Sequence, residues 1–127
     1  MAEILLVVED DPDMRELIKV TLSGDARLTL VGESTRAEEA LAEIRERRPD
    51  LIVLDHYIEG DVMGLELAPQ LKAVSPESKI LLFTSHDLAA EVAAEPAIDG
   101  YLRKRDLHLL LSTTLALLGL DGGAATS

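Results

Sequence analysis

The stretch LIVLD, residues 51–55, decides the fold of this chain of 127 residues. Four apolar residues in succession are typical of a strand that is buried on both faces, as in parallel sheets covered by helices. Asp55 then follows at the carboxyl end of the strand, where open α/β sheets place their functional groups. The stretch therefore predicts a central strand that presents a carboxylate to a site.

Four further apolar runs are separated by gaps wide enough to hold a helix each. Helical periodicity fills these gaps and also follows the last run, although Pro69 is awkward in a helix unless it lies in the first turn. Parallel neighbours require right-handed crossovers, so the alternation predicts an α/β fold: a doubly wound five-stranded parallel sheet with five helices. The other four strands are predicted at 4–8, 28–31, 80–83 and 98–102, and the helices at 14–22, 36–48, 65–74, 87–95 and 106–118.

Composition restricts the class of protein. The length fits one domain, expected over residues 1–120, and the final DGGAATS (121–127) is expected to be a disordered tail or the start of a linker. Without cysteine there is neither a disulfide nor a thiolate metal site, and neither a signal peptide nor a membrane span is predicted, so we expect a cytoplasmic protein. The net charge of -12 argues against direct binding to nucleic acid or anionic lipid.

Polar residues end the other predicted strands as well. Glu9 and Asp10 follow the first apolar run, Thr84 follows the fourth, and Lys104 follows the fifth. Three clustered carboxylates favour a hard cation, so the predicted cofactor is Mg²⁺, with Mn²⁺ or Ca²⁺ as alternatives. One carboxylate then remains as a nucleophile, with a hydroxyl and a lysine to meet a phosphoryl group. This set of groups fits the formation of an acyl phosphate.

Four motifs, in this order and spacing, resemble those of the receiver domain of two-component response regulators, over residues 3–118. They are ILLVVEDDPDMRELI (4–18), PDLIVLD (49–55), LLFTSHD (81–87) and GYLRK (100–104). The resemblance implies a flavodoxin-like receiver fold and a signalling switch that promotes only its own phosphorylation and dephosphorylation. It also implies a sensor histidine kinase or phosphotransfer protein as phosphoryl donor, an unknown downstream protein, and homodimerisation as an option.

The same resemblance assigns roles to individual residues. Asp55 would be the phosphoacceptor, and a face formed by the fourth helix, fifth strand and fifth helix would respond to its phosphorylation. The implied metal ligands are Asp10 directly, Glu9 largely through water, Asp55, and the backbone carbonyl of Tyr57. Thr84 and Lys104 would bind the phosphoryl group, Tyr101 would act as a packing switch, Ser85 would fill a position that needs a small residue, and Tyr57 and His86 would tune dephosphorylation.

Simpler interpretations compete with these roles. Asp11 and Asp13 suit the start of a helix, Tyr101 suits a half-buried strand position, and all three histidines, His56, His86 and His108, suit an exposed surface. The loop DHYIEGDVMG (55–64) lacks the proline usual in the family and is one residue longer, which leaves its geometry open.

Three rival functions also stay open. The chain could be a Mg²⁺-dependent phosphatase or hydrolase, although neither a second general acid nor a substrate cap is evident. It could be an interaction module that is never phosphorylated. It could also be the receiver piece of a longer DNA-binding regulator or hybrid kinase.

Overall fold

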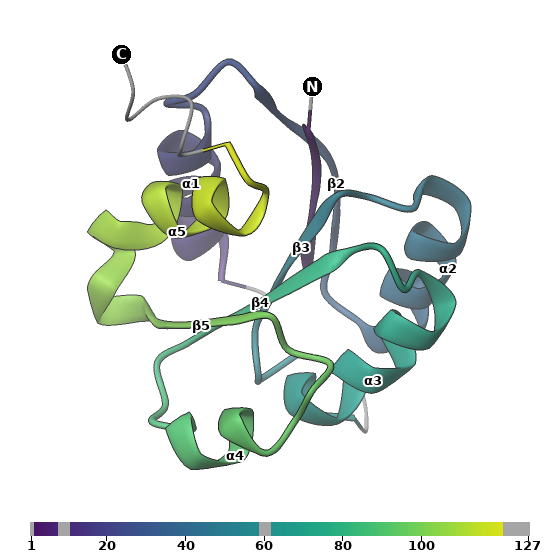
Figure 1. The fold of residues 1–127 in the computed structure, drawn as a ribbon. Coiled ribbons are helices and arrows are strands. Elements are labelled where there is room, and N and C mark those ends of the chain that lie inside the picture. The colour runs from purple at the N-terminus through teal and green to yellow at the C-terminus, as the bar shows by residue number, and fades with distance from the viewer. Residues whose placement is uncertain (1, 8–10, 59–61, 121–127) are drawn as a thin grey trace.

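The computed structural model describes residues 2–7, 11–58 and 62–120, and Figure 1 shows their arrangement. The strands are β1 (Ala2–Val7), β2 (Leu28–Ser34), β3 (Leu51–Leu54), β4 (Lys79–Thr84) and β5 (Gly100–Arg103). The helices are α1 (Pro12–Leu22), α2 (Ala37–Arg47), α3 (Gly64–Val74), α4 (Ala89–Ala93), the 3-10 helix η1 (Lys104–Leu109) and α5 (Leu110–Leu117). None of these described helices is long and apolar enough to span a bilayer.

All five strands are parallel and lie in the order β2-β1-β3-β4-β5. The sheet winds in both directions from its centre, because the chain starts at β1, moves out to β2, and then returns through β3 toward β5. The predicted α/β class and doubly wound parallel sheet are therefore confirmed. β3 is central, and its four residues are fully buried.

Helices cover both faces of the sheet (Figure 1). On one face, Leu5 and Val7 of β1 pack with side chains of α2 and α3, and Val92 of α4 packs at the edge of that cluster. On the other face, Ile4 and Leu6 pack with α1 and α5. The alternation along β1 follows from the two-residue period of a strand, and it explains why the apolar runs are continuous.

The start of α1 confirms the predicted capping role of Asp11. Its carboxylate accepts hydrogen bonds from the backbone amides of Asp13 and Met14, at 3.1 and 3.3 Å. These amides have no partner inside the helix, so the aspartate satisfies them and sets the first turn. Asp13 lies in that first turn, as predicted.

Several predicted boundaries need correction. The second strand, expected over 28–31, extends to Ser34. The fifth helix was expected over 106–118, but the chain forms η1 and then α5, with a break at Asp106 (φ −102°, ψ 31°). The fourth helix is reduced to Ala89–Ala93, and the fifth strand begins at Gly100 instead of residue 98. Leucine and alanine periodicity does not distinguish a 3-10 turn or a short helix from a longer α-helix.

Pro69 lies inside α3, beyond its first turn. The sequence pattern predicted this helix, although a proline beyond the first turn was expected to weaken it. In the structure the helix continues through Pro69. The flanking side chains explain why, since Leu67, Ala68 and Leu71 are fully buried against the sheet. Packing of this apolar face outweighs the lost backbone hydrogen bond.

Candidate functional site

Asp55 lies at the carboxyl end of β3, between β1 and β4. Its backbone amide donates to the carbonyl oxygen of Val7 at 2.8 Å, so the parallel ladder continues to the carboxylate itself. The residue is 1% exposed. A buried carboxylate needs a compensating charge or hydrogen bonds, so the sheet forces a partner onto this position.

Lys104, which follows the edge strand β5, supplies that charge. Its Nζ donates to Asp55 Oδ2 at 2.5 Å, and the side chains are 11% and 2% exposed. Lys104 is the first residue after β5 and begins η1. Two charges separated by 49 positions in the sequence are thus joined in a largely dry setting, where their attraction is only weakly screened.

Thr84 is the last residue of β4 and is completely buried. Its hydroxyl oxygen accepts a hydrogen bond from the His86 backbone amide at 3.3 Å, which leaves the hydroxyl hydrogen available for donation. The next residue, Ser85, is exposed, and its carbonyl accepts a bond of 3.0 Å from Nη2 of Arg103. The loop after β4 is therefore tied to β5.

Tyr101 of β5 is half-buried, and its hydroxyl makes two hydrogen bonds to the loop between β4 and α4. It donates to the carbonyl of His86 at 2.8 Å and accepts from the amide of Leu88 at 2.9 Å. Its ring packs against the core on the α2 and α3 face. This arrangement links the residue predicted as a switch to the segment that follows Thr84.

Tyr57 and His86 lie against each other beside the carboxylate. Their ring centroids are 4.5 Å apart, and a second contact of 4.9 Å joins Tyr57 to the ring of His56. Tyr57 is 40% exposed, so the pair stands at the solvent boundary of the site. Two residues predicted to tune dephosphorylation are thus brought together, one from each of two loops.

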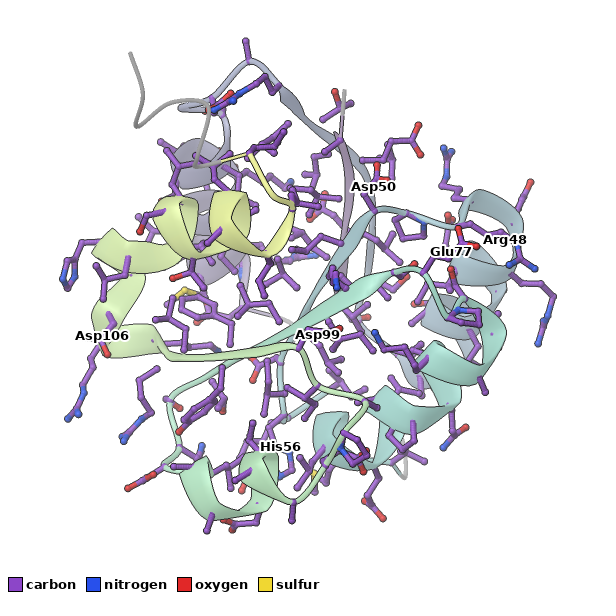
Figure 2. All side chains as sticks on the ribbon, in the orientation of Figure 1. Arg48, Asp50, His56, Glu77, Asp99 and Asp106 are labelled. Atoms are coloured by element: carbon purple, nitrogen blue, oxygen red, sulfur yellow. The ribbon has the colours of Figure 1, made fainter. Side chains whose placement is uncertain are left out.

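The prediction that His56 belongs to the exposed surface is wrong, whereas His86 and His108 are exposed as expected. The His56 imidazole is partly buried, and its Nδ1 accepts a hydrogen bond from the Leu65 amide at 3.3 Å. Burial, followed by the charge of nearby His86, holds the pKa of His56 below its ordinary value. Figure 2 shows His56 at the end of the sheet where α3 and α4 begin.

Gly64 is a site residue that the sequence patterns did not single out. A Cβ placed on it would lie 2.0 Å from the Asp55 carbonyl oxygen, and its amide donates to the His56 carbonyl at 2.6 Å. No side chain fits at this position without moving the backbone that carries the carboxylate. The available signal was a single glycine that opens a helix directly after a long loop.

A hard cation fits the described part of this site. Asp55 offers a carboxylate whose Oδ1 accepts only a long bond of 3.4 Å from the Tyr57 amide among the described residues. Carboxylate and backbone carbonyl oxygens are the donors that Mg²⁺ prefers. Glu9 and Asp10, the other predicted ligands, lie outside the described residues, two and three positions after Val7.

Comparison with known proteins gives concordant matches. Residues 5–114 match the family described as "Response regulator receiver domain". The chain is 35% identical over 102 residues to the response regulator protein VraR of Staphylococcus aureus. The aligned region covers 79% of this chain and 48% of VraR. The chain therefore spans about half the length of this relative.

Two solved structures are similar over nearly the whole chain. A two-component response regulator of the LuxR family from Aurantimonas has a TM-score of 0.84 at 28% identity, covering 94% of this chain and 86% of that one. The receiver domain of the putative response regulator NarL from Mycobacterium tuberculosis has a TM-score of 0.81 at 25% identity, with coverages of 93% and 96%.

Proposed function

Since the chain belongs to the response regulator receiver domain family of two-component systems, we propose that it acts as a phosphorylation-dependent switch with Asp55 as phosphoacceptor. The observation that carries the proposal is the buried ion pair between Asp55 and Lys104. This pair holds the Asp55 carboxylate at the carboxyl end of the parallel sheet, in contact with the ammonium group of Lys104. A phosphoryl donor would therefore meet both the nucleophile and a group that neutralises its charge.

The proposed step transfers a phosphoryl group from the phosphohistidine of a sensor histidine kinase or phosphotransfer protein. A bond forms between phosphorus and a carboxylate oxygen of Asp55, while the bond to the imidazole nitrogen of the donor breaks and leaves a histidine. Lys104 then pairs with a phosphoryl oxygen, and the Thr84 hydroxyl donates to another. Thr84 ends β4, which pairs with β3, and Lys104 follows β5 but already contacts Asp55, so little rearrangement of the backbone is needed.

Mg²⁺ is the proposed cofactor, with Mn²⁺ as a substitute. Glu9, Asp10, Asp55 and the backbone carbonyl of Tyr57 would hold it. When bound, the ion would neutralise the negative charge of the phosphoryl oxygens. The same charge would relieve the repulsion among the three carboxylates.

The response of the protein would arise at β5 and its neighbours. Lys104 directly follows Arg103, the last residue of β5, so a change of partner at Lys104 acts on the start of η1. The Tyr101 hydroxyl joins β5 to the loop before α4. We propose that phosphorylation shifts a two-state equilibrium of the face made of α4, β5, η1 and α5, which a downstream protein reads.

Acetyl phosphate tests this proposal without knowledge of the kinase. Incubated with Mg²⁺, the protein should gain the mass of one phosphoryl group, with release of acetate. Asp55→Asn and chelation of the metal should each abolish the gain, whereas the control Asp87→Asn, which changes an exposed aspartate of the loop before α4, should retain it. A protein that gains no mass and does not consume acetyl phosphate would instead be an interaction module; steady turnover without an adduct would indicate a hydrolase.

A second candidate concerns the length of the chain. The match covers 48% of VraR, which favours the proposal that residues 1–120 serve as the receiver part of a longer regulator and that 121–127 begin a linker. The alternative expectation for 121–127, a disordered tail, concerns residues outside the described part of the chain. Reading the gene beyond codon 127 tests the proposal, since an output domain encoded there would support it and a stop codon would exclude a regulator that continues after residue 127.

A further inference from the structure

His56 touches the beginning of α3 through both its backbone and its side chain. Its carbonyl accepts from the Gly64 amide at 2.6 Å, and its Nδ1 accepts from the Leu65 amide at 3.3 Å. These two amides belong to the first turn of α3 and have no partner within the helix. Met63, which precedes the helix, carries no side-chain oxygen to cap it. His56 therefore caps a helix that starts eight positions later.

The capped turn lies directly against the phosphoacceptor. A Cβ on Gly64 would be 2.0 Å from the Asp55 carbonyl oxygen and 2.8 Å from the Cα of His56, so the two backbones are in contact. A shift of the first turn of α3 must consequently move the backbone of Asp55. The cap and the carboxylate are parts of one rigid junction.

The other neighbour of His56 in the sequence faces the same site. The amide of Tyr57 donates to Asp55 Oδ1 at 3.4 Å, and its ring meets the ring of His56 edge to face at 4.9 Å. The orientation of the imidazole thus bears on Tyr57 as well as on α3. Both residues beside His56 are those proposed to hold the phosphoryl group and the metal.

We propose that His56 is a positioning residue: by capping α3 through Nδ1, it fixes the backbone that presents the Asp55 carboxylate and the main chain of Tyr57. The inference deepens the proposed function and rests on it. A donated hydrogen bond from Leu65 requires an unprotonated Nδ1, so the ring carries its hydrogen on Nε2. His56 does not touch the phosphoryl group.

Two substitutions separate positioning from general stabilisation. The side-chain oxygen of asparagine can take the place of Nδ1, whereas that of glutamine lies one bond further out, near the place of Nε2. His56→Asn should therefore preserve the cap, and His56→Gln should lose it. His108→Gln is the matched control, because His108 is exposed on η1, far along the chain from the loop.

The experiment measures amide hydrogen exchange by NMR and the rate of phosphorylation by acetyl phosphate at fixed Mg²⁺. In His56→Gln the Leu65 amide should exchange about fivefold faster, as expected for loss of a cap. Phosphorylation should slow about tenfold, as when a residue that orients metal ligands is removed. His56→Asn should stay within about twofold of wild type in both, since a conservative acceptor maintains the cap.

Two results would overturn the inference. A normal phosphorylation rate in His56→Gln, even with faster exchange at Leu65, would reduce the cap to a structural role. Equal losses in the asparagine and glutamine variants would show that the position of the acceptor atom is unimportant.

If wild type takes up no phosphoryl group, the proposed function fails by itself. The positioning role is then decided by the backbone resonances of Asp55 and Tyr57. These must shift in His56→Gln and remain in place in His56→Asn and His108→Gln; unchanged resonances in the glutamine variant would refute it.

Discussion

The pairing of Asp55 with Lys104 illustrates how burial changes the effect of a single residue. Both side chains are nearly inaccessible, so removal of Lys104 takes the salt-bridge partner away from the buried Asp55 carboxylate. Lys19 and Glu33 form a pair of similar length, 2.7 Å, but their side chains are 35% and 30% exposed. Solvent screens the second pair and not the first.

Lys104→Met should therefore lower the free energy of unfolding by about 3 kcal/mol. Lys19→Met, the matched control, should lower it by at most about 1 kcal/mol. Urea denaturation followed by circular dichroism measures both. Added Mg²⁺ should restore part of the loss in Lys104→Met, because a bound cation can replace the missing charge. Equal losses in the two variants would contradict this account of the site.

Gly64→Ala should damage both stability and phosphorylation. The new Cβ would be 2.0 Å from the Asp55 carbonyl oxygen, and backbone atoms cannot move aside as a flexible side chain can. A loss of about 2 kcal/mol is expected from overpacking. Gly119→Ala is the contrast, since Gly119 has a φ of +73° but nothing within 4 Å of its Cβ position. That variant should be strained and yet be phosphorylated at the normal rate.

Some of the site residues could be predicted from sequence patterns, and others could not. The positions of Asp55 and Lys104 at strand ends could be predicted, because Asp55 directly follows the apolar run 51–54 and Lys104 comes one residue after the stretch 98–102. His56 and Gly64 could not, because their roles depend on how the loop between β3 and α3 closes. Their contacts are a backbone hydrogen bond from Gly64 to His56 and a single side-chain cap on Leu65, and neither leaves a periodic pattern in the sequence.

At the scale of elements, the existence and order of the strands and of the first three helices could be predicted because their patterns are regular, although the start of the fifth strand could not. The region from η1 to α5 could not be divided correctly. Its leucines repeat with a spacing that suits an α-helix throughout, whereas Asp106 leaves the helical region and interrupts it. Similarly, the Asp99 carboxylate accepts from the Ile80 amide at 2.8 Å and from Lys72 at 2.6 Å, and β5 begins only after it.

Pro69 offers a test of how α3 tolerates a poor helix former. The missing amide deprives the Leu65 carbonyl of its partner four residues later. Pro69→Ala should restore this bond and raise the free energy of unfolding by about 1 kcal/mol, after the greater freedom of the unfolded chain is subtracted. Thermal and urea unfolding measure the gain. A lower stability would show that the ring of Pro69 contributes packing that outweighs the hydrogen bond.

At the scale of the whole molecule, Arg27 connects the two ends of the described chain. Its carbonyl accepts from the Ala2 amide at 2.8 Å, and its Nη1 donates to the Leu120 carbonyl at 3.2 Å. The guanidinium is fixed by Asp25, at 2.7 Å, in the turn that follows α1. Both ends are therefore held near the start of the sheet, opposite the phosphoacceptor.

The side-chain and backbone hydrogen bonds from Arg27 lower the pKa of Asp25 from 3.8 to about 2. Between these values the unfolded chain binds a proton that the folded chain does not, so this stabilisation is complete above pH 3.8 and is lost as the pH falls toward 2. The stability difference between wild type and Asp25→Asn should shrink over that window. NMR titration of the Asp25 carboxyl provides a direct check, and a midpoint at its ordinary value would disprove the pairing in solution.

The order of the strands along the chain also affects when the proposed phosphorylation site is complete during synthesis. A nascent chain that has emerged through Asp55 already includes the edge strand β2 and the two strands β1 and β3 that pair at the middle of the sheet, so its amino-terminal half can begin to collapse. Asp55 would then be present without Lys104, which is synthesised 49 residues later. Under the proposed function, a nascent chain that ends before Lys104 would lack the residue proposed to pair with the phosphoryl group, so the order of the strands along the chain would delay phosphorylation until β5 has been made.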